Sequence, residues 1–217
     1  MSLASPSYVV VEGPIGAGKT SLARRLATAY GSEVLLEEPE HNPFLERFYQ
    51  APRQYALPTQ LFFLFQRARQ LQALKQGDIF RPVRVADFLL EKDELFARLN
   101  LEDDEWRLYE QVYAHMSLDI PVPDLVIYLQ APVDVLMERV RKRGIDYERA
   151  IRRDYLERLS ESYTRFFYDY NKAPLLIVNA ASANFVDSDA DFQALLDFIK
   201  RLRSGGRHFF NPSPFHL

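Results

Sequence analysis

The residues best suited to chemistry lie near the start of the chain, in the run Gly13-Pro14-Ile15-Gly16-Ala17-Gly18-Lys19-Thr20. This run fits G-x-x-x-x-G-K-[ST], a glycine-rich loop that binds nucleotide phosphates. Its glycines permit positive φ, so that successive backbone N–H groups can surround a phosphate. Lys19 can reach the β and γ phosphates, and the Thr20 hydroxyl can hold Mg²⁺. We therefore expect ATP or GTP to bind with Mg²⁺ at Gly13, Pro14, Ile15, Gly16, Ala17, Gly18, Lys19, Thr20 and Ser21.

The elements on either side of this loop fit the same interpretation. Residues 8–12 form a short run with three consecutive β-branched residues, which predicts a buried strand. The apolar residues of 19–30 recur every three or four positions, which predicts a helix that ends at Gly31. A phosphate loop needs this order, because the N-terminus of the helix adds partial positive charge.

Further along the chain, short apolar runs alternate with helical patterns, which is typical of a parallel α/β sheet. The predicted strands are 33–37, 81–87, 125–129 and 175–179, and the predicted helices are 55–75, 92–99, 103–116, 133–143, 147–170 and 189–203. We expect a three-layer α/β P-loop fold with about five parallel strands flanked by helices. Residues 1–203 are predicted to form a single domain, and residues 204–217 a flexible tail.

Composition limits the class of protein. The 217 residues include no cysteine, which excludes disulfides and thiolate metal sites and suits a reducing cytoplasm. Neither a membrane span nor a signal-peptide pattern is evident, so we expect a cytoplasmic protein with no membrane partner. The net charge of −3 disfavours nucleic acid, yet residues 139–153 hold seven basic residues and two acidic ones. A small anionic ligand such as a triphosphate fits that distribution.

Two acidic residues follow strands of the predicted sheet, at the edge that faces the phosphate loop. Asp87 ends the third predicted strand and is placed to hold Mg²⁺ together with Thr20. Glu38 follows the second strand and is placed to take a proton from an attacking hydroxyl, although an exposed loop acid would fit this position equally well. Glu37 is the rival, but strand alternation is expected to send its side chain to the opposite side.

These features favour a small-molecule phosphotransferase. A GTPase would need Asp-x-x-Gly after the third strand, but Phe88-Leu89-Leu90 follows Asp87. Asn171-Lys172-Ala173-Pro174 begins like a guanine-reading motif, but it has proline in place of the carboxylate. A mechanical ATPase usually has a longer chain.

Four further segments occur in an order that is highly specific behind a phosphate loop. They are Glu38-Pro39, the run 42–49 (NPFLERFY), Thr59-Gln60 with Arg67 seven residues on, and Arg143-Gly144 followed by Tyr155-Leu156. On these residues the chain resembles the deoxyribonucleoside kinases, in particular the bacterial deoxyadenosine/deoxyguanosine kinase branch, from about residue 8 to about residue 198. The resemblance implies a P-loop kinase fold with an arginine-rich lid, a homodimer, and ATP-dependent phosphorylation of the 5′-hydroxyl of a deoxyribonucleoside. Purine deoxynucleosides are favoured, and deoxycytidine is a further candidate.

The resemblance also gives roles to individual residues. Glu38 matches the general base, and Gln60 matches the residue that pairs with the base edge, where its carboxamide offers both a donor and an acceptor. Tyr49 and Glu148 match the residues that bind the 3′-hydroxyl, and Tyr49 would also crowd a ribose 2′-hydroxyl. The substrate-binding residues are therefore expected to be Glu38, Tyr49, Gln60, Arg67, Asp87, Asp93, Phe96 and Glu148, with Arg67 and Asp93 completing recognition of the base.

The basic segment corresponds to the lid of the family. Arg139 and Arg143 match lid arginines that stabilise the transferring phosphoryl group, so both are expected to be catalytic together with Lys19. The loop 179–187 would cover the donor adenine, with Phe185 stacking on it.

Two positions depart from the family pattern. Phe88 stands where most members have an arginine that links the base carboxylate to the donor phosphates, and Arg84 and Lys92 are the candidates to replace it. Ile145 stands in place of a third lid arginine.

Two other functions remain open on the sequence. A nucleoside monophosphate kinase, such as a thymidylate kinase, would need arginines for an acceptor phosphate and would need no general base. A nucleotide-dependent binding protein would transfer no phosphoryl group.

Overall fold

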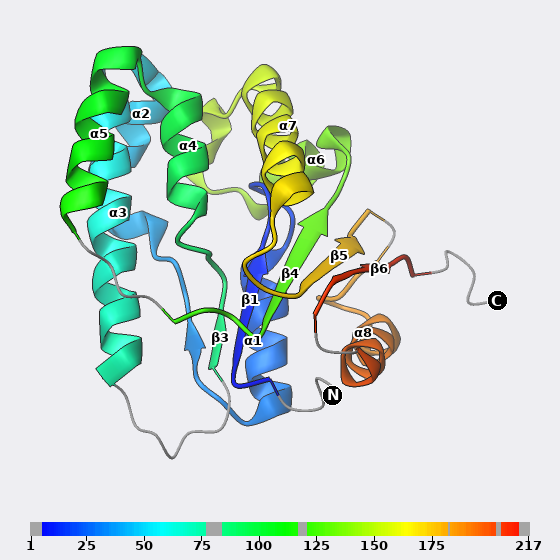
Figure 1. Ribbon diagram of the computed structural model, residues 1–217. Coiled ribbons are helices and arrows are strands. Elements are labelled where there is room, and N and C mark those ends of the chain that lie inside the picture. The colour runs from blue at the N-terminus through cyan, green and yellow to red at the C-terminus, as the bar shows by residue number, and fades with distance from the viewer. Residues whose placement is uncertain (1–5, 77–83, 117–120, 182, 203–204, 213–217) are drawn as a thin grey trace.

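The computed structural model describes residues 6–76, 84–116, 121–181, 183–202 and 205–212 (Figure 1). Six strands and eight α-helices lie in this described part. The strands are β1 (Tyr8–Glu12), β2 (Val34–Leu35), β3 (Arg84–Ala86), β4 (Leu125–Gln130), β5 (Leu175–Asn179) and β6 (Arg207–Phe210). The helices are α1 (Lys19–Tyr30), α2 (Leu45–Gln50), α3 (Pro52–Gln76), α4 (Lys92–Asn100), α5 (Asp103–His115), α6 (Val133–Arg143), α7 (Arg153–Asp169) and α8 (Asp189–Arg201).

The strands form one parallel sheet in the order β2-β3-β1-β4-β5-β6. Strand β1 is central and fully buried, with Val9 paired with Val85 on one side and with Leu125 on the other. The chain builds β2 and β3 on one side of β1 and β4 to β6 on the other. The strand order therefore reverses direction at β1. In parallel α/β sheets, ligands bind at the carboxyl ends of the strands beside such a reversal. The carboxyl end of β1 leads directly into the phosphate loop. The predicted α/β fold is confirmed.

The helices flank the sheet. Helix α1 packs on β1 and β3, while α3 contacts α2, α4 and α5, and α4 contacts α7, as Figure 1 shows. Among the helices that the structure describes, none carries an apolar stretch that could span a lipid bilayer. Helix α3 begins at Pro52, three residues before the predicted start at residue 55, so Pro58 lies inside the helix. The helix predicted at 147–170 is interrupted, because Ile151 and Arg152 are extended between a 3₁₀ turn (Asp146–Ala150) and α7.

The edges of the sheet differ most from the prediction. Strand β2 has two residues rather than five, and the predicted positions 81–83 lie outside the described residues. The prediction of a flexible tail is wrong for Arg207–Phe210, which pair with β5 as the parallel strand β6. The half-buried ring of Phe210 packs on Phe198 and on Phe185. Glycines and prolines around this strand weaken its local pattern, so its formation depends on the open edge of β5.

Candidate active site

The phosphate loop joins β1 to α1 and has the geometry that its glycines allow. Gly16 has φ +85°, and a Cβ atom there would lie 2.7 Å from the carbonyl oxygen of Leu136 on α6. Only glycine fits such a position without displacing the helix. Lys19 folds back over the loop and donates from Nζ to the carbonyl oxygens of Gly13 at 2.8 Å and Pro14 at 3.2 Å. Its ammonium group therefore lies at the mouth of the loop.

Thr20 and Asp87 lie together next to the loop. The Thr20 hydroxyl donates to Oδ2 of Asp87 at 2.5 Å, and Oδ1 of Asp87 accepts from the backbone N–H of Glu37 at 2.6 Å. Burial raises the pKa of Asp87 above its ordinary value, although these hydrogen bonds oppose the shift. A hydroxyl and a carboxylate are oxygen ligands of the kind that Mg²⁺ prefers, so the pair fits this ion.

Two cavities meet at the phosphate loop. The first, of about 160 Å³, is lined by the loop, by α3 and by residues after β2. The second, of about 670 Å³, is lined by the loop, by α6 and by residues 180, 181 and 183–187. Gly16, Gly18, Ser21 and Arg143 line both. The arrangement offers one compartment on each side of the phosphate-binding backbone.

The structure places Glu37, and not Glu38, in the first cavity. Glu37 lines the cavity with a side chain that is 17% exposed, whereas the Glu38 side chain is 47% exposed and pairs with His41 at 3.0 Å. The expectation that Glu37 faces away is wrong, because β2 ends at Leu35 and strand alternation does not extend beyond it.

The backbone of residues 36–38 is fixed from both sides. Asp87 accepts the N–H of Glu37, while Gln70 and Gln66 on α3 donate to the carbonyl oxygens of Leu36 at 2.9 Å and Glu38 at 3.1 Å. The segment thus bridges the end of β3 and helix α3, and this turns the side chain of Glu37 towards the cavity.

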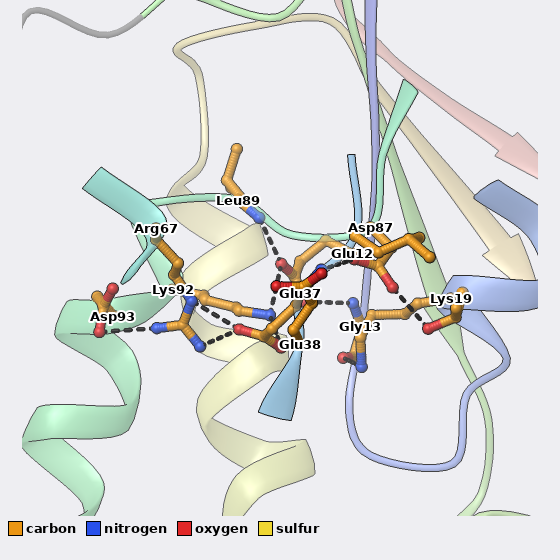
Figure 2. Close-up of polar contacts among 12 residues, drawn as sticks. Glu12, Gly13, Lys19, Glu37, Glu38, Arg67, Asp87, Leu89, Lys92 and Asp93 are labelled. Carbon is orange, nitrogen blue, oxygen red and sulfur yellow. Dashed lines mark hydrogen bonds and ion pairs between the residues drawn. The ribbon is translucent and has the colours of Figure 1, made fainter. Parts of the chain in front are cut away.

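Figure 2 shows that Glu37 belongs to a row of alternating charges. Arg67 donates from Nε to Glu37 at 2.6 Å, and its Nη1 lies 2.7 Å from Asp93. On the other side of Glu37, Nζ of Lys92 lies 3.0 Å from Oε2 of Glu37 and 3.5 Å from Oε2 of Glu12. Burial opposes the charge of Glu37, but Arg67 and Lys92 outweigh it and lower the pKa of Glu37 to about 2.

Other polar and aromatic side chains complete the first cavity. Gln60 is buried at 2% exposure, and its Oε1 has no hydrogen-bond partner within the described part of the chain. Tyr49 lies parallel to Tyr147, at 6.4 Å between ring centroids. Phe96 and Glu148 also line the cavity. A buried amide oxygen that faces a cavity without a partner is placed to accept a hydrogen bond from a ligand.

Three residues of the basic segment, Arg139, Lys142 and Arg143, line the second cavity. Arg143 forms a two-pronged ion pair with Glu148, with Nε to Oε2 at 2.9 Å, and Arg139 donates from Nη2 to the carbonyl oxygen of Ala180 at 2.7 Å. Phe185 lines this cavity from the loop opposite. The two arginines and Phe185 therefore border the same space.

Comparison with known proteins shows the family to which the chain belongs. The sequence model of the family described as deoxynucleoside kinase matches residues 9–203. The chain belongs to this family. A deoxyguanosine kinase of Bacillus subtilis (strain 168) is 33% identical over 204 residues, covering 90% of this chain and 97% of the relative. A deoxyadenosine kinase of Lactobacillus acidophilus is 29% identical, covering 91% and 97%.

The fold agrees with this membership. A solved structure of deoxyadenosine kinase from M. mycoides with bound dATP is similar, with a TM-score of 0.75, 24% identity, and coverage of 88% of this chain and 98% of the other. As a member of the deoxynucleoside kinase family, the protein is an enzyme that phosphorylates deoxynucleosides.

Within this kinase, most residues predicted from the sequence lie around the two cavities. Gly16, Gly18, Lys19, Thr20, Tyr49, Gln60, Arg67, Asp87, Phe96, Arg143 and Glu148 line the first, and Arg139 and Phe185 line the second. Asp93 lies behind Arg67, and Glu38 lies outside the first cavity. Sequence reasoning gave no role to Glu12 or Tyr163. A carboxylate at the end of an apolar strand, directly before the loop, was the signal available for Glu12.

Proposed function

We propose that the protein transfers the γ-phosphoryl group of ATP to the 5′-hydroxyl of a purine deoxynucleoside. The meeting of two cavities at one phosphate loop supports this proposal most directly. The cavity beside α6 would hold the donor nucleotide, and the cavity beside α3 would hold the nucleoside.

In this scheme Glu37 is the general base, in place of Glu38. The 5′-oxygen forms a bond to the γ-phosphorus as its proton passes to the carboxylate of Glu37, while the bond from phosphorus to the β–γ bridging oxygen breaks and ADP leaves. Glu37 remains ionised at neutral pH because its pKa is about 2. Thr20 and Asp87 would hold Mg²⁺, whose charge offsets that of the phosphates. Lys19 would bind the phosphate oxygens.

The acceptor cavity suits a nucleoside rather than a nucleoside monophosphate. Apart from Lys19 of the phosphate loop, the cations that line it (Arg67, Lys92 and Arg143) are each paired with a carboxylate, which leaves little charge for an acceptor phosphate. A catalytic carboxylate such as Glu37 suits a neutral hydroxyl, since a phosphate nucleophile needs no base. These pairings favour the nucleoside kinase over the monophosphate kinase.

Two sets of residues in the first cavity would recognise the base and the sugar of the acceptor. The amide of Gln60 would bond the purine edge, with Arg67 and Asp93 behind it and Phe96 against the ring. Tyr49 and Glu148 would bind the 3′-hydroxyl. The purine preference draws on the relatives named deoxyguanosine and deoxyadenosine kinase.

On the donor side, Arg139 and Arg143 would move onto the phosphates as a lid, and Phe185 would contact the adenine. The homodimer also remains a proposal, which light scattering of the purified protein would test.

A substrate screen tests the function. Purified protein with Mg-ATP would be offered the four deoxynucleosides, their ribose analogues and the deoxynucleoside monophosphates. We expect 5′-phosphorylation of deoxyguanosine and deoxyadenosine at the highest kcat/KM. Phosphorylation of monophosphates alone would contradict the proposal, and preference for a pyrimidine would contradict its purine component.

A further inference from the structure

Glu12 is a buried carboxylate to which the proposed reaction gives no part. It ends β1 with 0% exposure. Oε1 accepts from the N–H of Gly13 at 2.8 Å and from the Tyr163 hydroxyl at 2.9 Å, while Oε2 accepts from the N–H of Leu89 at 2.8 Å. The same Oε2 lies 3.5 Å from Nζ of Lys92. One side chain therefore ties the first residue of the phosphate loop to the segment that leads into α4.

Lys92 is buried at 2% exposure, and its ammonium group lies between Glu12 and Glu37 (Figure 2). It lines the acceptor cavity together with Lys19. The two cations are close enough for Lys92 to contribute to lowering the pKa of Lys19, after the larger effect of burial. An ammonium group that lines this cavity next to Lys19 is placed to contact the phosphoryl group as it passes from donor to acceptor.

The charges on either side show which cation can reach the reacting group. Arg67 lies between Glu37 and Asp93, on the side of Glu37 away from the phosphate loop, and within the described residues neither of these partners forms a hydrogen bond or ion pair with the loop. Lys92 is tied to the phosphate loop through Glu12, whose Oε2 lies 3.5 Å from Nζ of Lys92 and whose Oε1 accepts the N–H of Gly13. Arg84 lies at the opposite end of the sheet, since it starts β3 and pairs with Tyr8 at the start of β1. Lys92 is thus the candidate that the geometry retains for the role of the absent arginine.

We propose that Lys92 is a catalytic residue that contacts both Glu37 and the transferring phosphoryl group, and that Glu12 is the residue that positions it. The inference rests on the proposed function. Because Glu12 holds Gly13 with one oxygen and Lys92 with the other, it sets the separation between the phosphate loop and this ammonium group. A rigid cation aimed at developing charge lowers the barrier more than a mobile one.

The test compares Lys92→Met, Glu12→Gln and the double variant, with measurements of kcat, both KM values and thermal unfolding. Lys92→Met should lower kcat by about 10²–10³-fold with little change in KM, as expected for a contact made in the transition state. Lys92→Met alone should also lose stability, because Glu12 stays buried without its cationic partner, whereas Glu37 keeps Arg67. The double variant should regain stability without regaining kcat. Lys172→Met, at an exposed lysine paired with Glu91, is the matched control and should leave kcat unchanged.

Two results would overturn the inference. One is a kcat for Lys92→Met within about threefold of the unmodified protein, and the other is a double variant in which kcat returns together with stability, as for a purely structural pair. If Lys92→Met does not fold, kcat of the double variant decides. Failure of the unmodified protein to phosphorylate any nucleoside would overturn the proposed function as well, so the two failures are distinguishable.

Discussion

Oδ1 of Asp87 accepts a hydrogen bond from the backbone N–H of Glu37 at 2.6 Å. The carboxylate proposed to hold the metal therefore also fixes the backbone of the proposed general base. Its second oxygen meets the Thr20 hydroxyl at 2.5 Å, so the phosphate loop, the metal ligand and the base form one connected unit. Changes at Asp87 should accordingly affect both metal binding and chemistry.

The first prediction concerns pH. Burial raises the pKa of Asp87, and a carboxylate must be ionised to bind Mg²⁺, so the Mg²⁺ requirement should rise as the pH falls towards that raised pKa. The acid limb of activity should then move to lower pH when Mg²⁺ is increased. Glu37 cannot produce this limb, because its pKa of about 2 keeps it ionised throughout. Rates measured against pH at several Mg²⁺ concentrations check this prediction. An acid limb that stays at the same pH at every Mg²⁺ concentration would contradict it.

The second prediction concerns the 3′-hydroxyl. Tyr49→Phe keeps the ring that lies parallel to Tyr147 but removes the phenolic hydroxyl. We expect KM for the deoxynucleoside to rise about tenfold, the value of one buried hydrogen bond, with a smaller change in kcat. Tyr168→Phe, at an exposed ring on α7, is the control. An unchanged KM would remove Tyr49 from this role.

The third prediction concerns the base. Gln60→Ala removes the unpartnered Oε1 and the amide from the acceptor cavity, so KM for deoxyguanosine and deoxyadenosine should rise by about 10–100-fold. Gln111→Ala on the exposed face of α5 serves as the control. Steady-state kinetics with each nucleoside check the prediction. A rise in the KM for ATP, with no change in the KM for either nucleoside, would show that Gln60 acts at the donor site and not at the acceptor site.

The fourth prediction concerns β6. Phe210 packs on Phe198 and Phe185, so Phe210→Ala should lower the free energy of unfolding by about 1–3 kcal/mol, less than for a fully buried ring. Because Phe185 lines the donor cavity, KM for ATP should also rise. Phe209→Ala in the same strand is the control, since that ring is 61% exposed. Equal thermal unfolding of the two variants would indicate a strand without a structural role.

Local patterns predicted the parts of the site that depend on neighbours in sequence. The phosphate loop is defined by residues 13–20, and the strand and helix beside it follow from their own periodicity. The roles of Gln60 and Arg67 are predicted only from the family resemblance, which rests on local segments such as Thr59-Gln60 with Arg67 seven residues on.

The remaining features depend on partners that are distant in sequence. Hydrogen bonds that Asp87 and glutamines of α3 form with the backbone of residues 36–38 determine that Glu37, and not Glu38, lines the cavity. Strand alternation cannot predict this, because β2 ends at Leu35. The pairing of Lys92 with Glu12 joins residues 80 positions apart in one buried pair, which periodicity cannot reveal. Strand β6 likewise forms by pairing with the edge of β5, which is distant from it in sequence.

The central claim is that Glu37, rather than its neighbour, takes the proton from the 5′-hydroxyl. The most direct test is the single-turnover rate of phosphoryl transfer from Mg-ATP to deoxyguanosine in Glu37→Gln and Glu38→Gln, with ATP binding measured separately. We expect Glu37→Gln to bind ATP and lose about 10²–10⁴-fold in rate, and Glu38→Gln to stay within about threefold of the unmodified enzyme. A large loss in Glu38→Gln together with a near-normal rate in Glu37→Gln would contradict the account.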